Sequence, residues 1–304
     1  MLPLALSFAI LAVSTASILI RFAQREAPSL TIAVLRLGVA TLLLAPAVLL
    51  HHTEQFRSIR GRALALAATS GLFLAIHFGT WITSLEYTTV ASSVVFVSTG
   101  PLWVGLLTPL FLREATSRRT LLGLALAVLG GLAIALGGTC QWSLPLRCPT
   151  DPAPVRIDAR VGNLLALLGA FALAGYLMVG RRLRSEISLL PYVFVVYGFA
   201  TMVLAVFTLI AGQSVLGFGG ATYLWIFLLA LVPQILGHST YNWALRYAPA
   251  TLVAAATLGE PLASSLLALA FLNETPPPSL LFGGILILSG VFVATRQAVI
   301  GLRG

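Results

Sequence analysis

Long apolar stretches recur along the whole chain, and short polar segments rich in arginine, glycine and proline separate them. Each stretch is roughly 20 residues long, the length at which an α-helix crosses the hydrocarbon core of a bilayer. The pattern predicts an all-α fold with ten membrane-spanning helices, at residues 2–22, 29–50, 63–84, 90–111, 120–138, 161–181, 189–211, 222–245, 250–271 and 279–297. The first stretch lacks the basic start of a signal peptide, so we interpret it as a retained helix.

Composition supports the same class of protein. Hydrophobic residues make up 59% of the chain and charged residues only 9%. A soluble domain carries about 25% charged residues, so the composition excludes that class. The net charge of +9 could suggest a nucleic-acid partner, but the arginines lie singly or in short groups between apolar runs. We therefore expect an integral membrane protein surrounded by the lipid bilayer, with no nucleic acid as partner.

The distribution of arginine predicts the orientation in the membrane. If the N-terminus is inside, the inner loops and the C-terminal tail hold 12 of the 18 arginines, the outer loops hold 5, and Arg36 lies within a span. Short loops rich in arginine favour the cytoplasm. We predict that both termini are cytoplasmic and that the protein resides in a plasma membrane, the inner membrane of a bacterium.

Two segments of the chain, which begin at Ser84 and Ala244, align without a gap at a constant offset of 160 residues. We therefore predict two five-helix repeats, residues 1–138 and 161–304, joined by an outer loop at 139–160. Because five is an odd number, the second repeat is expected to enter the membrane from the opposite side. The identical pairs include Tyr87 with Tyr247, Pro101 with Pro261, Glu114 with Glu274, Gly123 with Gly283 and Gly130 with Gly290.

The repeated unit also resembles a known family. The first copy, Leu85 to Leu136, contains Pro101, Phe111-Leu112-x-Glu114 and Leu121-Leu122-Gly123, and the second, Leu245 to Thr295, contains Glu260-Pro261, Phe271-Leu272-Asn273-Glu274 and Gly283. These motifs resemble the EamA-type module of the drug/metabolite transporter superfamily. The resemblance implies ten helices and the export, or in some members the uptake, of small metabolites such as amino acids or their derivatives. Arg113 and the prolines at 276–278 depart from the family pattern at helix ends.

Glu260 and Pro261 stand side by side near the middle of the ninth predicted span. An ionised acid is costly in hydrocarbon and proline removes a backbone hydrogen bond, so the pair is expected to serve a function. Gly259 loosens the same turn, and the repeat places Gly100 and Pro101 at the equivalent turn of the fourth span. We predict two helix breaks that line a cavity and take part in gating. The alternative is that prolines are simply common in membrane helices.

Polar and aromatic side chains recur at helical spacing within three predicted spans. Such a stripe turns away from lipid, toward protein or water. Two simpler interpretations stay open: the tryptophans and Tyr241 could anchor or pack helices, and the histidines could be buried with satisfied hydrogen bonds. The candidate substrate-binding or coupling residues on these faces are His77, Trp81, Trp103, Gln234, His238, Tyr241 and Asn242.

Three interpretations compete for Arg36 in the second span: its side chain extends to the outer surface, pairs with Glu260, or binds a substrate carboxylate. Bidentate binding by a guanidinium favours the last of these. Cys140 and Cys148 flank a short segment of the predicted outer loop, where a structural disulfide is plausible. Glu114 and Glu274 are expected to cap or pair with helix ends. We expect no cofactor, because neither zinc-type spacing nor a Walker motif occurs.

Together these features predict a secondary transporter that exports a small organic metabolite by alternating access. We expect its cavity to be lined by the third, fourth, eighth and ninth spans, with contributions from the first, second and seventh. Glu260 would bind a substrate ammonium group or exchange a proton, so protons are a second expected partner. An enzyme is not expected. The alternatives are a membrane-embedded enzyme that acts on a lipid, with His77, His238 and Glu260 as acid/base groups, and a passive facilitator of small solutes.

Overall fold

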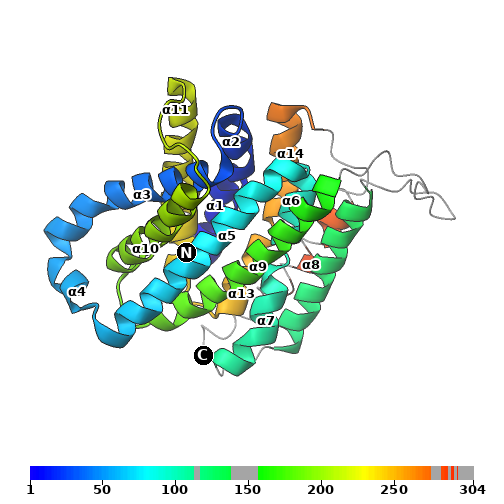
Figure 1. Ribbon diagram of the computed structural model, residues 1–304. Helices are drawn as coiled ribbons and strands as arrows, with labels where there is room; N and C mark the ends of the chain where they lie inside the picture. Colours follow the sequence, from blue (N-terminus) through cyan, green and yellow to red (C-terminus); the bar gives the residue numbers. More distant parts are fainter. Residues whose placement is uncertain (113–116, 138–156, 275–281, 287–288, 291–292, 294–304) are drawn as a thin grey trace, which may run out of the picture.

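The computed structural model describes residues 1–112, 117–137, 157–274, 282–286, 289–290 and 293 of the 304-residue chain. These residues form helices and short connections, with no strand among them (Figure 1). The first half contains α1 (Leu2–Ser14), α2 (Ala16–Ala23), α3 (Ser29–His51), α4 (Thr53–Ser58), α5 (Gly61–Tyr87), α6 (Val90–Val97), α7 (Gly100–Phe111) and α8 (Arg118–Gly137). The second half contains α9 (Ile157–Arg184), α10 (Leu189–Ile210), α11 (Gly220–Leu229), the π-helix η1 (Ala230–His238), α12 (Ser239–Ala244), α13 (Ala250–Thr257) and α14 (Glu260–Leu272).

Eight stretches of the described chain are long and apolar enough to cross a membrane. They coincide with eight of the predicted spans. The fifth predicted span is helical, as α8, and the tenth lies partly outside the described residues, with its described parts at 282–286, 289–290 and 293 helical. The membrane-spanning, all-helical class is thus confirmed, and the count of ten stays a prediction. The eight stretches are Leu2–Ala23, Ser29–His51, Gly61–Tyr87, Val90–Phe111, Ala159–Arg184, Leu189–Ile210, Gly220–Ala244 and Ala250–Leu272.

Helix boundaries repeat between the two halves at the offset of 160 residues. α3 begins at Ser29 and α10 at Leu189, while α6 and α13 match at both ends. A polar contact repeats in the same way. The Gln24 side-chain amide donates to the Ile82 carbonyl at 2.9 Å, and Arg184 Nε donates to the Asn242 carbonyl at 3.0 Å. The duplication seen in the sequence therefore extends to helix ends and to side-chain contacts.

The halves differ where local sequence differs. In the first half, the helical path breaks at Thr15, whose hydroxyl donates to the Ala12 carbonyl, whereas the equivalent α9 is continuous. In the second half, the counterpart of the continuous α5 contains η1, a nine-residue π-helix around Pro233. Proline has no N–H to donate, and π-helical insertions in helices are frequent at functional sites. η1 ends at His238, one of the candidate site residues.

α5 and α9 lie side by side through the middle of the molecule (Figure 1). Small residues on α9 permit this close approach. A Cβ atom on Gly169 would lie 3.3 Å from the Trp81 Cβ and 3.4 Å from the His77 carbonyl oxygen. The packing of α9 against α5 therefore holds the backbone beneath two candidate site residues in place.

Glu274 joins helix ends, as the sequence predicts. Its carboxylate lies 3.5 Å from Arg21 and accepts a hydrogen bond from the Val90 N–H, the first residue of α6, at 3.3 Å. An acid at the start of a helix also meets the positive end of the helix dipole. Its repeat partner Glu114 lies outside the described residues.

Glu26 connects the α2–α3 turn to the start of α11. Its carboxylate accepts hydrogen bonds from the Thr222 hydroxyl at 2.7 Å and from the Gly219 N–H at 2.8 Å. These two bonds, that of Thr222 first, lower the pKa of Glu26 from its ordinary value of 4.5. A group whose pKa falls on folding stabilises the fold above its unfolded pKa, and this contribution disappears as the pH falls through the folded pKa.

We expect the Glu26→Gln variant to unfold at a lower temperature than the parent protein near neutral pH. The difference should shrink as the pH falls through the lowered pKa of Glu26, because the parent carboxylate then becomes neutral as well. Thermal unfolding in detergent, followed by tryptophan fluorescence between about pH 3 and 7, measures this. Glu186→Gln is the matched control, because Glu186 is the exposed repeat partner and its side chain makes no hydrogen bond within the described chain. A difference in unfolding temperature that is equally large at acidic and neutral pH would contradict the prediction.

Candidate functional site

Two helices are interrupted at repeat-equivalent positions. α6 ends at Val97 and α7 begins at Gly100, while α13 ends at Thr257 and α14 begins at Glu260. Two turn residues separate the helices in each case. Pro101 and Pro261 stand in the first turn of the helices that follow, where the missing proline N–H breaks the hydrogen-bond ladder of a continuous helix. Both interruptions thus lie at the glycine and proline pairs that the sequence marks.

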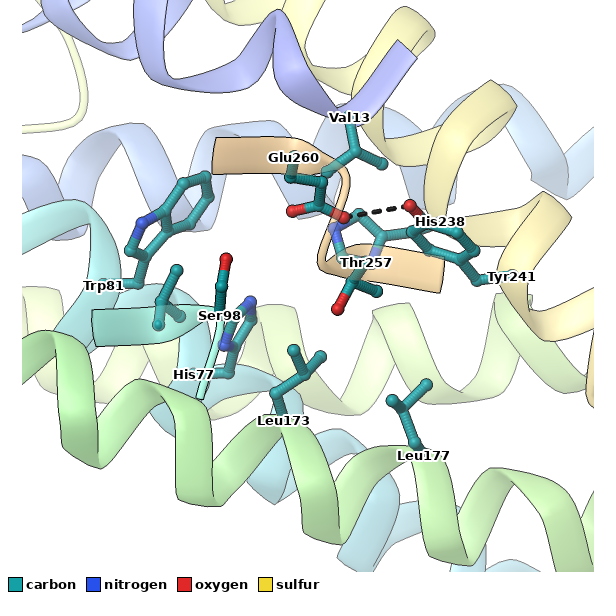
Figure 2. A pocket seen from close by; sticks show the side chains of 11 residues that line it. Val13, His77, Trp81, Ser98, Leu173, Leu177, His238, Tyr241, Thr257 and Glu260 are labelled. Atoms are coloured by element: carbon teal, nitrogen blue, oxygen red, sulfur yellow. Dashed lines mark hydrogen bonds between the residues drawn. The ribbon is translucent and has the colours of Figure 1, made fainter. Parts of the chain in front are cut away.

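A small cavity lies between the two interruptions, and Figure 2 shows the side chains around it. Its volume of ≈20 Å³ is room for about one water molecule. In this conformation the space is too small for an organic metabolite. The lining residues are Val13, His77, Trp81, Val97, Ser98, Leu173, Leu177, His238, Tyr241, Thr257 and Glu260.

Both repeats build the cavity, and they do so with equivalent positions. Three pairs of lining residues are related by the offset of 160 residues, so the cavity lies where the two halves face each other. The remaining lining residues have repeat partners that do not line the cavity. Glu260, for example, corresponds to Gly100. The equivalent pairs are Val13 with Leu173, Trp81 with Tyr241, and Val97 with Thr257.

Glu260 is the acidic side chain of the cavity. The residue begins α14, where the positive end of the helix dipole favours a carboxylate. Its Oε1 accepts a hydrogen bond of 2.9 Å from the Tyr241 hydroxyl, drawn as a dashed line in Figure 2. Among the described residues it forms no ion pair. The carboxylate therefore keeps acceptor capacity toward the cavity.

Four aromatic rings surround the carboxylate. His77 Nδ1 lies 2.9 Å from the Gly169 carbonyl oxygen, and because a carbonyl only accepts, Nδ1 carries the hydrogen. The neutral ring then has Nε2 as a free acceptor. Trp81 stacks on His77 with centroids 5.8 Å apart, and the His238 ring lies 6.3 Å from His77 and 6.2 Å from Tyr241. The cavity therefore combines one carboxylate with a wall of aromatic and aliphatic side chains.

Arg36 lies behind this wall. It is fully buried, its Nε donates to Gln234 Oε1 at 3.0 Å, and its guanidinium carbon lies 4.0 Å from the centroid of the Phe78 ring. Within the described residues, both terminal nitrogens of Arg36 and the amide nitrogen of Gln234 have no partner. Two interpretations of Arg36 thus fail: the side chain does not reach the surface, and it does not pair with Glu260. Binding of a substrate carboxylate stays a prediction, and it would require Arg36 to become accessible.

An unpaired buried arginine destabilises a fold, because removing a charge from water costs several kcal/mol. We expect Arg36→Met, which fills a similar space without charge, to raise the unfolding temperature by roughly 2–4 °C and to weaken transport. Thermal unfolding in detergent and uptake into liposomes measure the two effects. Arg25→Met is the control, because Arg25 is exposed and packs over Phe22. A lower unfolding temperature together with normal transport would show that Arg36 is only structural.

The other two predicted site residues also lie outside the cavity lining. Trp103 packs edge-on against Phe171, with centroids 5.5 Å apart. The Asn242 side-chain amide donates to the Tyr176 hydroxyl and, at 2.8 Å, to the His238 carbonyl. Asn242 therefore supports the backbone of a lining residue. Cys140 and Cys148 fall outside the described residues, so their pairing stays a prediction.

The sixth span contributes to the cavity, which the sequence interpretation missed. Leu173 and Leu177 stand one helical turn apart on α9 and form one wall. The repeat could have indicated this contribution, because Leu173 is the repeat partner of Val13 on the first span. Neither residue is polar, however, so there was no chemical reason to select Leu173 from the sequence. The second and seventh spans, expected to contribute, lie behind the lining instead. Their Arg36 and Tyr197 contact Gln234 on η1.

Comparison with known proteins agrees with this architecture. A solved crystal structure shares the fold with a TM-score of 0.73 at 20% sequence identity, over 97% of this chain and 96% of that chain. An uncharacterized transporter of Archaeoglobus fulgidus is 25% identical over 77% of this chain and 76% of its own length. The uncharacterized transporter YetK of Bacillus subtilis is 32% identical over 35% of this chain and 29% of its own length. The model of the EamA-like transporter family matches twice, at residues 2–136 and 160–296. With both repeats matched over most of its length, the chain belongs to the EamA-like transporter family of the drug/metabolite transporter superfamily and is a membrane transporter.

Proposed function

We propose that this transporter is a secondary carrier that moves a small organic metabolite by alternating access, with its substrate site in the cavity between the two helix interruptions. The observation that carries the proposal is the construction of the cavity from three repeat-equivalent pairs. A site on the symmetry element of two inverted halves can open to either side when one half rocks against the other.

The placement of two equivalent arginines supports the inverted arrangement. Arg21 donates to the Thr88 carbonyl, just beyond the C-terminal end of α5. Arg181, its repeat partner, lines a pocket together with Arg62 at the N-terminal end of the same helix. Since α5 is long enough to cross the membrane, we expect these equivalent groups near opposite membrane surfaces.

The size of the cavity indicates what must move. Room for about one water cannot hold a metabolite, so the substrate requires a wider conformation. The two interruptions are suitable hinges, because at Ser98–Thr99 and Leu258–Gly259 the α-helix gives way to a two-residue turn. We propose that rotation at these turns opens and closes the site.

The chemistry of the wall suggests the kind of substrate. Glu260 offers a carboxylate, His77 Nε2 offers a further acceptor, and Trp81 and Tyr241 offer aromatic faces. Such a set suits an ammonium group attached to an apolar body, which agrees with amino acids or their derivatives. Glu260 would bind the ammonium group or exchange a proton with it during the cycle. Export is the direction we predict.

A ligand screen followed by a transport assay tests the proposal. Purified protein is heated in the presence of amino acids, nucleosides, vitamins and polyamines, since a ligand of the native state raises the unfolding temperature. The compound with the largest shift is then loaded into proteoliposomes for a counterflow assay. Saturable exchange that is accelerated by substrate on the opposite side would identify a carrier. Non-saturable flux without such acceleration would indicate a passive facilitator and overturn the proposal.

A further inference from the structure

A second, larger pocket lies far from the cavity, at one end of the helices. It opens beside the start of α5 and the ends of α7, α9 and α12, where four candidate spans begin or end. Its volume is ≈810 Å³. Because spans end where the hydrocarbon ends, this pocket lies at the level of the lipid headgroups. The distribution of arginine predicts that this side is cytoplasmic.

Three unpaired arginines face this pocket from three segments of the chain. Arg62 comes from the start of α5, Arg182 from the end of α9, and Arg246 from the turn after α12. All three side chains are exposed and make no hydrogen bond or ion pair within the described residues. Arg181 completes the wall and donates to the Leu245 carbonyl at 2.7 Å, while Glu186 is the acidic residue of the lining. Positive charge therefore dominates the pocket.

One side of the pocket is apolar and belongs to the membrane. Leu110 and Phe111 at the end of α7 are 73% and 66% exposed, and Leu112 continues the same edge. The pocket thus combines arginine side chains with an adjacent exposed apolar surface. This combination suits a molecule with a negatively charged head and an apolar tail.

The repeat provides an internal comparison. The pocket lined by Arg21, Glu86 and Ala159 occupies the equivalent place at the opposite ends of α5 and α9. There, Glu86 stands at the position of Arg246, so the lining holds one arginine and one glutamate. Charges at that end are balanced. Four arginines and one glutamate thus line the first pocket, whereas one arginine and one glutamate line the second.

We propose that the basic pocket binds the phosphate headgroup of an anionic phospholipid, with its acyl chains along Leu110 and Phe111. Arginine is well suited to bind phosphate through two parallel N–H donors, and basic pockets between membrane helices bind anionic headgroups. This proposal stands apart from the transport cavity, because the two pockets share no lining residue.

Lipid titration with native mass spectrometry tests the proposal. The purified full chain in neutral detergent is titrated separately with phosphatidylglycerol, phosphatidylcholine and inorganic phosphate. We expect phosphatidylglycerol to bind at least tenfold more tightly than phosphatidylcholine. The double variant R182Q/R246Q should weaken phosphatidylglycerol binding about 25-fold, at roughly fivefold for each arginine. R62Q serves as a second, milder variant that should lose about fivefold.

The charge-matched control is R57Q/R60Q, which removes two exposed arginines that do not line the pocket but are predicted to face the same side. It should bind phosphatidylglycerol within about twofold of the parent. Equal losses of phosphatidylglycerol affinity in both double variants would show that general surface charge causes the effect, and would overturn the proposed site. Binding of inorganic phosphate as tight as that of the lipid would assign the pocket to a soluble phosphate instead. Equal affinity for phosphatidylglycerol and phosphatidylcholine would also overturn the proposal.

Discussion

Replacing Glu260 by glutamine is expected to lower gradient-driven accumulation of the substrate by at least about 30-fold, because removing a half-buried, hydrogen-bonded carboxylate that pairs with the substrate costs at least about 2 kcal/mol. Glutamine keeps the shape of the side chain and can accept the Tyr241 hydrogen bond, but it has neither the negative charge nor a carboxyl group that can take up and release a proton. The measurement uses proteoliposomes and the ligand found by the thermal-shift screen, with accumulation under a pH gradient and counterflow recorded in parallel.

The two assays separate the two roles of Glu260. If the carboxylate exchanges a proton, counterflow survives in the glutamine variant while accumulation is lost. If it binds a substrate ammonium group, both are lost. Unchanged transport in both assays would refute a role for Glu260. This failure would leave the lipid proposal intact, because phosphatidylglycerol binding is measured at a different pocket.

Tyr241→Phe is the matched control for this experiment. It keeps the aromatic ring and removes only the hydroxyl that donates to Glu260. A hydrogen bond to a charged group contributes about 1.5–3 kcal/mol, so we expect a loss of about tenfold in transport and a smaller loss than in Glu260→Gln. A Tyr241→Phe effect larger than that of Glu260→Gln would mean that the phenol acts on the substrate directly.

Replacing Gly71 by alanine is expected to cause the largest loss of stability among single-methyl changes in the α5–α10 contact. The added Cβ would lie 2.6 Å from the Phe199 Cβ, 2.9 Å from the Val196 carbonyl oxygen and 3.1 Å from the Ala200 nitrogen. Two of these atoms belong to the backbone of α10, so relief requires the helices to separate. Overpacking of this kind costs about 1–3 kcal/mol, and we expect a lower unfolding temperature and less folded protein in detergent.

Gly220→Ala is the control for this substitution. No atom lies within 4 Å of the position of its added Cβ, and the residue is in the first turn of α11, where alanine favours helix. Its unfolding temperature, from the same fluorescence measurement, should equal or slightly exceed that of the parent. An equal loss in both variants would show that the glycine-mediated contact between α5 and α10 is unimportant for stability.

Several local features could be predicted from the sequence. The interruptions at Gly100-Pro101 and at Gly259-Glu260 follow from proline chemistry, which acts within one helical turn. The repeat follows from identical residues at one spacing, and the matching starts of α6 and α13 agree with it. His77, Trp81, His238, Tyr241 and Glu260 could be selected because polar and aromatic groups are exceptional within apolar spans.

Contacts between distant segments could not be predicted in this way. Arg36 is 198 residues away from Gln234 along the chain, and His77 is 92 residues away from Gly169. Neither partner can be identified from helical spacing, which relates only neighbours on one helix. The same applies to the leucines of α9 in the cavity wall and to the arginines that converge on the basic pocket.

The sequence by itself determined the membrane class, the duplication, the helix interruptions and the carboxylate beside one of them, because each depends on hydrophobicity or on backbone hydrogen bonds within a few residues. Only the tertiary structure decided that Arg36 lies behind Phe78, that α9 closes the cavity and that one of two duplicated pockets gathers arginines. Those features depend on which helix faces meet, and the packing of side chains across the whole chain decides that.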